Sequence, residues 1–188
     1  MVIDLTLRLA SGARAAAAVV AFAVGGTLLF RLSPYDALKG ILGGPSLPEE
    51  TITNPDRLAQ TLETLGPAGR DAYLQFQLWD VINPVLMGLA GAMLLGWMLQ
   101  RSGRSNSAWR LVVLVPFVLL LADLLENVVI ARALVAYPDG SAFSNALPVV
   151  TAVKFGAAIS MALSVVVLVF LWTRDRLVGR ARSSGVSE

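Results

Sequence analysis

Four long apolar segments restrict what this chain can fold into. They cover residues 15–30, 79–99, 111–131 and 147–172. A helix needs about 17–25 mostly apolar residues to cross the hydrocarbon core of a bilayer, and each segment reaches or approaches that length. The sequence therefore predicts an all-α integral membrane protein built as a four-transmembrane-helix bundle.

The rest of the chain leaves little room for a second folded unit. The protein has 188 residues, 56% of them hydrophobic, and a mean hydropathy of +0.69. That composition is far from the balance of a soluble domain. Outside the four segments we expect an outer loop at residues 31–78 and a cytoplasmic tail at residues 173–188. The sequence thus predicts a single membrane domain over residues 1–188.

The distribution of arginine predicts which side of the membrane each connection occupies. Cytoplasmic segments of membrane proteins carry an excess of lysine and arginine. With four spans, both tails and the turn between the second and third spans share one side, and together they contain nine arginines. These are Arg8, Arg14, Arg101, Arg104, Arg110, Arg174, Arg176, Arg180 and Arg182. We expect both termini in the cytoplasm and the protein in a bacterial inner (plasma) membrane. This charge pattern requires no nucleic-acid partner.

Part of the outer loop has the pattern of a helix. Residues 53–56 combine a capping side chain, a proline at the first helical position and an acid in the first turn. Three leucines share one side of the helix that follows, namely Leu58, Leu62 and Leu65. We expect Gly66 to end this helix and Pro67 to open another that continues into the second span. The partly helical loop then either caps the bundle or lies along the membrane interface.

Polar side chains interrupt the third apolar segment on one face. Asp123, Glu126 and Asn127 are three and four residues apart, so they share a face of a helix. Asp123 falls near the middle of its span, and the other two lie about one turn closer to the outer side. An ionisable group at that depth costs at least about 2.5 kcal/mol, which makes it a candidate functional residue.

Two other spans contribute polar residues at similar depth. The second span places Asp80 and Asn83 just inside its outer boundary, and the fourth places Lys154 about two turns below the outer surface. Lys154 and Glu126 should be partners. The predicted ligand- or proton-binding residues are Asp80, Asn83, Asp123, Glu126, Asn127 and Lys154.

The charges of this predicted site do not balance. Three carboxylates face one ammonium, so full ionisation would leave an excess negative charge in a medium of low dielectric. We expect a proton, a cation or an arginine from the outer rim, Arg31 or Arg132, to compensate. Asp123 is the carboxyl that we expect to be protonated when the site is empty.

A structural interpretation of the same residues stays open. Hydrogen-bonded polar side chains often hold membrane helices together, so Lys154, Glu126 and Asn127 also fit a pin that fixes helix register without any ligand. Two prolines within the apolar segments, Pro84 and Pro116, are expected to bend their helices. The bend at Pro84 would lie beside Asn83, at the mouth of the polar site.

The composition excludes several kinds of chemistry. The chain has no histidine and no cysteine, which excludes bis-histidine haem, imidazole zinc sites, Ser-His-Asp catalysis and thiol redox chemistry. No phosphate-binding loop or dinucleotide fingerprint is present. We therefore expect neither a cofactor nor a metal, and the sequence identifies no catalytic residue.

Three classes of function remain. The first is a membrane protein whose polar site binds or moves a proton, a cation or an amphipathic small ligand. The second is an accessory or assembly subunit in which the polar cluster is structural. The third is a lipid-modifying enzyme that uses Asp123 and Glu126 as an acid–base pair. We favour the first, and we expect membrane lipids as partners, with a homodimer or a larger membrane complex left open because alternating access would require a dimer.

Overall fold

The computed structural model describes residues 1–44, 46–139 and 142–184, and side chains as far as residue 178. The fold is 86% helical, and no strand occurs in these residues. Four stretches are long and apolar enough to cross a membrane: Gly12–Leu32, Pro55–Arg101, Ala108–Val135 and Ala142–Val178. The prediction of an all-helical chain with four long apolar helices is therefore confirmed.

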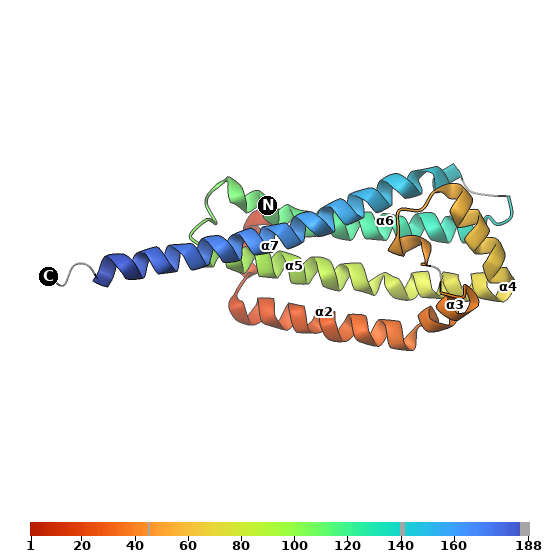
Figure 1. The fold of residues 1–188 in the computed structure, drawn as a ribbon, viewed down its shortest axis with the longest axis horizontal. Coiled ribbons are helices and arrows are strands. Elements are labelled where there is room, and N and C mark those ends of the chain that lie inside the picture. The colour runs from red at the N-terminus through yellow and green to blue at the C-terminus, as the bar shows by residue number, and fades with distance from the viewer. Residues whose placement is uncertain (45, 140–141, 185–188) are drawn as a thin grey trace.

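The long helices lie side by side along the longest axis of the molecule (Figure 1). They are α2 (Gly12–Leu32), α5 (Ile82–Arg101), α6 (Val115–Val135) and α7 (Leu147–Ser184). Helix α2 packs on α5, α5 packs on α6 and α7, and α6 packs on α7. Helices α2 and α7 thus lie on either side of α5. The N-terminus and the end of α7 lie toward the same end of the molecule as the α5–α6 connection.

Glycines allow the close approach of the central helix to its neighbours. A Cβ atom at Gly91 of α5 would lie 2.5 Å from Sδ of Met161 on α7 and 3.1 Å from Cβ of Pro116 on α6. A Cβ at Gly88 would lie 2.8 Å from the Leu120 side chain. Such small residues let helix backbones approach closely, which is how membrane helices gain packing energy.

The segment between α2 and α5 is folded against the helix ends. It contains α3 (Tyr35–Ile41), the short 3₁₀ helix η1 (Pro48–Glu50) and α4 (Pro55–Asp80). The Asn54 side chain accepts a hydrogen bond from the Arg57 backbone N–H at 2.8 Å and so caps α4. Gly66 breaks α4 with φ of 63°, as predicted. The leucines of the predicted apolar side are all buried: Leu58, Leu62 and Leu65.

The helix after Pro67 continues into the second apolar segment, as predicted. A one-residue turn at Val81, whose backbone stays in the helical region, separates α4 from α5. Pro84 has no N–H to donate to the Asp80 carbonyl, so the helix is weakened at that point. Pro116 does not bend a helix from within. It lies in the first turn of α6, after the 3₁₀ helix η2 (Ala108–Leu114), where proline is tolerated.

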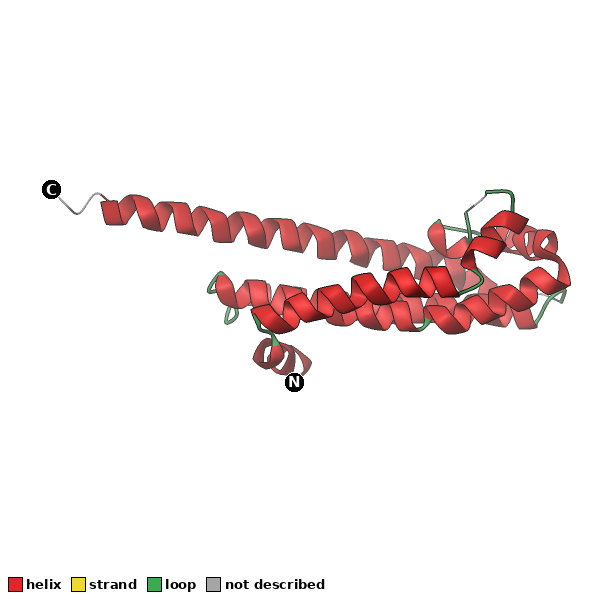
Figure 2. Cartoon of the chain, turned by 90° about the horizontal axis from the view of Figure 1, so that it is seen from below, coloured by secondary structure: helices red, strands yellow, loops and turns green. Residues whose placement is uncertain are grey.

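The two ends of the chain are more helical than expected. An unpredicted helix, α1 (Val2–Leu9), packs on α5 and η2. Helix α7 continues through most of the predicted C-terminal tail to Ser184 and extends past the other helices (Figure 2). No proline interrupts this stretch and its arginines and leucine favour helix, so the helix has no local reason to end at Trp172. Arg104 also forms an ion pair with Asp175 at 2.9 Å.

Candidate functional site

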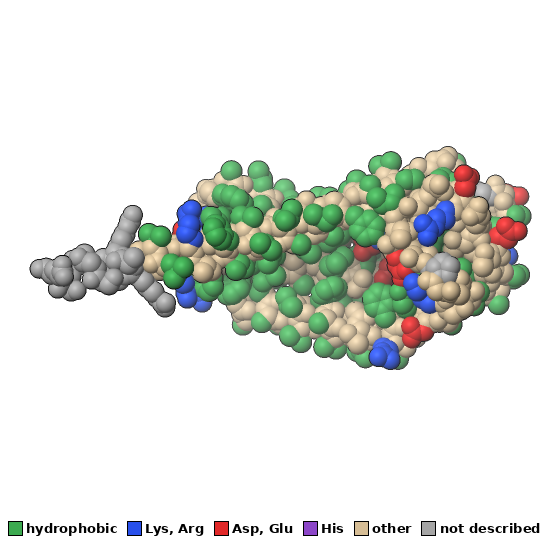
Figure 3. All heavy atoms as spheres, in the orientation of Figure 1, with side chains coloured by type: hydrophobic (Ala, Val, Ile, Leu, Met, Phe, Trp, Pro, Cys, Tyr) green, Lys and Arg blue, Asp and Glu red, His purple; other side chains and the backbone are tan. Residues whose placement is uncertain are grey.

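A cavity of about 270 Å³ lies where the segment between α2 and α5 meets the ends of the long helices. Residues from six helices and η1 line it: Phe30, Tyr35, Glu49, Glu50, Phe76, Asp80, Asn83, Asp123 and Lys154. Figure 3 shows acidic side chains in a hollow of the surface between α2 and α7, toward the end occupied by α3 and α4. The cavity therefore brings together residues from almost the whole length of the chain.

The Lys154 ammonium is fully engaged by neighbouring oxygens. Its Nζ atom donates a hydrogen bond to Oε2 of Glu126 and another to the backbone carbonyl of Glu49 at 2.7 Å. Oδ1 of Asp123 lies 3.6 Å from the same nitrogen. The Thr151 hydroxyl, one turn before Lys154 on α7, also donates to Glu126. The predicted pairing of Lys154 with Glu126 is present. Together with the contacts to Glu49 and Asp123, it uses most of the hydrogen-bonding capacity of the ammonium group.

Two further carboxylates line the cavity without comparable compensation. Asp80 is 6% exposed, and its Oδ2 atom accepts a hydrogen bond from the Asn127 amide at 3.2 Å. Within the described residues Asp80 has no ion pair. Asp123 is also 6% exposed, and its contact with Lys154 is longer than a normal hydrogen bond. Since Glu126 and Asp123 share the single charge of Lys154, the three acids together carry an excess negative charge when ionised.

The structure brings all six predicted residues to one place. Asp80, Asn83, Asp123 and Lys154 line the cavity. Glu126 and Asn127 lie behind it, each bonded to a lining residue. The expected charge compensation by an arginine is not found, because neither Arg31 nor Arg132 forms an ion pair with these acids in the described part of the chain. Whether the six residues bind anything stays a prediction.

Sequence reasoning missed Glu49. The residue was placed in the outer loop without a role, yet η1 carries it into the cavity. Its Oε2 atom accepts a hydrogen bond from the Tyr73 hydroxyl, while its Oε1 atom is buried without a partner. No helical periodicity marks Glu49, because it lies in an irregular connection. The only available signal was Tyr73, which shares a helical stripe with Asp80.

The two neighbouring acids of η1 are in opposite electrostatic states. Burial raises the pKa of the Glu49 carboxyl to about 8, the hydrogen bond from Tyr73 opposes this, and the nearby acids Asp80 and Glu126 add to it. Burial alone would also raise the pKa of Glu50, but hydrogen bonds from Lys39, at 2.8 Å, and Tyr35 hold it below its usual value. Glu49 is therefore largely protonated at neutral pH and Glu50 is ionised.

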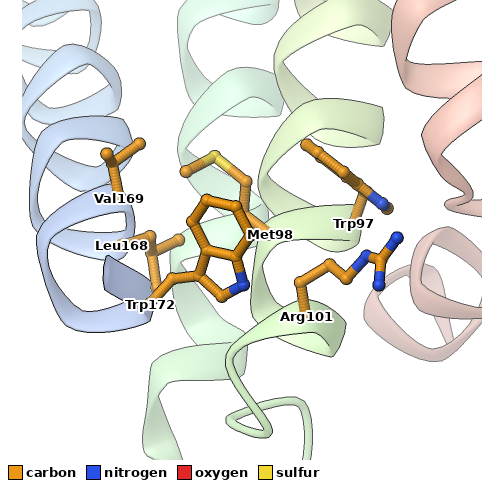
Figure 4. Close-up of a pocket in the computed structure, with 6 residues that line it drawn as sticks. All are labelled: Trp97, Met98, Arg101, Leu168, Val169 and Trp172. Carbon is orange, nitrogen blue, oxygen red and sulfur yellow. The ribbon is translucent and has the colours of Figure 1, made fainter. Parts of the chain in front are cut away.

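A second pocket lies between α5 and α7 at the opposite end of the molecule (Figure 4). Its volume is only about 70 Å³, and its lining is almost entirely apolar. The residues around it are Trp97, Met98, Arg101, Leu168, Val169 and Trp172. It brings no carboxylate or nucleophile to its walls, in contrast to the acidic cavity.

Comparison of the chain with models of known protein families, with curated proteins and with solved structures found no match. The function is therefore argued from the geometry of the acidic cavity.

The raised pKa of Glu49 predicts a specific pH dependence of stability. Between pH 4.5 and about 8 the unfolded chain loses this proton while the folded protein keeps it. The unfolded state then binds fewer protons, so the free energy of unfolding falls as pH rises through this window. We expect Glu49→Gln to remove that component, as measured by thermal unfolding in a non-ionic detergent across the window.

Glu63→Gln is the matched control for this measurement, because Glu63 lies on the exposed side of α4. It should keep the pH profile of the natural protein. If Glu49→Gln also keeps that profile, the Glu49 carboxyl titrates normally and the account of its burial is wrong.

Proposed function

We propose that this chain is an integral membrane protein whose four long helices cross the bilayer as one domain. Apolar side chains cover the outside of these helices, and in the most apolar windows of α2 and α7 only 17% and 11% of residues are buried. Such a surface is stable in lipid and not in water. The arginine-rich end, with both termini, is assigned to the cytoplasm of a bacterial inner membrane. The acidic cavity then lies in the outer half.

We infer that the cavity binds a positively charged species, either a proton or a cation. The observation that carries this inference is Asp80, a carboxyl 6% exposed that has no ion pair within the described residues. Burying an ionised carboxylate without a partner is costly, so a proton or a cation is needed beside it. Asp123 lines the same cavity and increases the need for a proton or a cation there.

The same geometry assigns a structural role to the other half of the cluster. Glu126 is 0% exposed, and its two oxygens are bonded to Lys154 and Thr151. This pair fits the interpretation of a polar pin between α6 and α7. The pin and the binding site are therefore adjacent and distinct, with Asp123 between them.

The arrangement supports a lipid-modifying enzyme or an accessory subunit less well. An acid–base pair of Asp123 and Glu126 requires both carboxyls to reach a substrate, and Glu126 lies behind the cavity wall. A purely structural cluster would have its acids satisfied, as Glu126 is and Asp80 is not. Movement of the bound cation across the membrane remains part of the proposal, and it requires a second conformation.

Cation binding can be followed directly at the carboxyl groups. We expect addition of methylammonium chloride to convert protonated carboxyls to carboxylates, seen by infrared difference spectroscopy of the protein in lipid nanodiscs. Asp80→Asn and Asp123→Asn should each reduce the change, and the double variant should abolish it. Asp71→Asn removes the same charge from the exposed side of α4 and should behave as the natural protein does. An identical response of the double variant would refute a cation site at these residues.

The proposed orientation has its own test. The chain has no cysteine, so single-cysteine variants report one position each. Gln60→Cys, on the exposed side of α4, should react with a membrane-impermeant maleimide in intact cells. Asn106→Cys, in the α5–α6 connection, should react only after permeabilisation. The reverse pattern would place the acidic cavity on the cytoplasmic side.

A further inference from the structure

We infer that the ligand of the acidic cavity is an organic ammonium ion carrying an apolar chain. This inference rests on the proposed function, because it names the class of cation that Asp80 and Asp123 would take. Its own support is a cluster of aromatic rings that lines the same cavity as the acids, and an apolar hollow beside them.

Three aromatic rings stand together on one wall of the cavity. Phe30 of α2 and Tyr35 of α3 meet edge to face, with ring centroids 4.9 Å apart. Phe76 of α4 lies 5.6 Å from Tyr35 and 6.4 Å from Phe30. All three rings line the cavity together with Asp80 and Asp123. The cavity is thus lined by both carboxyl groups and aromatic rings.

This combination fits a weakly hydrated organic cation. The face of an aromatic ring attracts a cation most when the cation sheds its water readily, as alkylated ammonium ions do. The Lys39 ammonium already lies 5.9 Å from the centroid of Tyr35 while paired with Glu50. A ring of this wall therefore accommodates an ammonium group in the protein itself. Lys154 also lines the cavity and lies 3.6 Å from Asp123, but its one charge is shared with Glu126 and does not balance three acids.

A calcium ion fits the cavity less well than an organic cation. Calcium takes six to eight oxygen ligands, and among the described residues no group of three acids is close enough to hold a metal ion. The volume agrees with a larger guest, since about 270 Å³ far exceeds the roughly 10–15 Å³ that a single water requires. An alkylated ammonium head group would occupy more of this volume.

An apolar chain attached to the ammonium has a path out of the cavity. Helices α2 and α7 lie on either side of α5, and Figure 3 shows hydrophobic side chains along the hollow between them. Phe30 stands at the boundary, lining the cavity while remaining 37% exposed. In a bilayer this hollow faces acyl chains, so the tail of an amphipathic amine would leave the cavity sideways into lipid.

The test compares three soluble probes by isothermal titration of the purified protein in a non-ionic detergent. Hexyltrimethylammonium carries both features, tetramethylammonium lacks the tail, and hexanol lacks the charge. We expect hexyltrimethylammonium to bind at least about tenfold more tightly than tetramethylammonium, since each buried methylene is favourable. Hexanol should show no saturable binding. Titration of the Asp80→Asn/Asp123→Asn double variant measures the heat of probe partition into detergent micelles. This heat is subtracted from the heat measured with the natural protein.

The aromatic wall is tested by substitution at its most exposed ring. Phe30→Leu should weaken hexyltrimethylammonium binding by about three- to thirtyfold, through loss of the cation–π attraction. Phe30→Tyr keeps an aromatic ring and should keep the affinity. Phe170→Leu, the same substitution on the exposed side of α7, is the matched control and should change nothing.

The outcomes separate this inference from the proposed function. If methylammonium alters the carboxyl spectrum but hexyltrimethylammonium binds no more tightly than tetramethylammonium, the amphipathic ligand is wrong and the cation site stands. Equal effects of Phe30→Leu and Phe170→Leu would overturn the aromatic wall. If no ammonium ion binds and the carboxyl spectrum does not respond, the proposed function fails as well.

Discussion

The hydrogen bonds of Lys154 join three parts of this protein, namely α7, α6 and η1. The ammonium on α7 binds the Glu126 carboxylate on α6 and the backbone carbonyl of Glu49 in η1. It therefore fixes two long helices to each other and draws the segment between α2 and α5 down onto them. Breaking such a buried pair leaves a charge without compensation, which costs about 3–5 kcal/mol in proteins where it has been measured. The position of η1, and with it one wall of the cavity, depends on this contact.

The same contact determines the electrostatics of the cavity. The ammonium lies closer to Glu126 than to Asp123, and its single charge cannot neutralise all the neighbouring acids. Asp80 and Asp123 line a cavity that aromatic rings also line. We propose that such a site takes up a positive charge. The structural role of Lys154 and the proposed binding role of the acids would then follow from one arrangement.

The features that the sequence predicted are those that local patterns encode. Apolar runs of 16 residues or more identify the four long helices, and the spacing of Asp123, Glu126 and Asn127 places them on one face. The pairing of Lys154 with Glu126 followed from their depth in adjacent spans. Gly66 was found from its position after an apolar helical stripe. Each of these depends on residues that are close in sequence or on the thickness of the bilayer.

The missed features depend on contacts between distant segments. Glu49 reaches the cavity because η1 binds Lys154, which is 105 residues away in the chain. Helix α1 is stabilised by packing on α5 and η2, and the turn at Val81 combines a missing proline N–H with the packing of α4 across the helix ends. The aromatic wall likewise joins α2, α3 and α4. Periodicity does not report such pairings, so the sequence predicted the acidic residues of the cavity and not its aromatic ones.

Lys154 pairs more tightly with Glu126 than with Asp123, and its one charge leaves the acids of the cluster with an excess negative charge. Double-mutant cycles of unfolding free energy in detergent test this pairing most directly, using Lys154→Met with Glu126→Gln and Lys154→Met with Asp123→Asn. We predict a coupling energy for Lys154 and Glu126 that exceeds the coupling of Lys154 and Asp123 by at least about 1 kcal/mol, within the range for residues in contact. Equal couplings, or a stronger coupling to Asp123, would show that the ammonium already neutralises the cavity and would contradict the account.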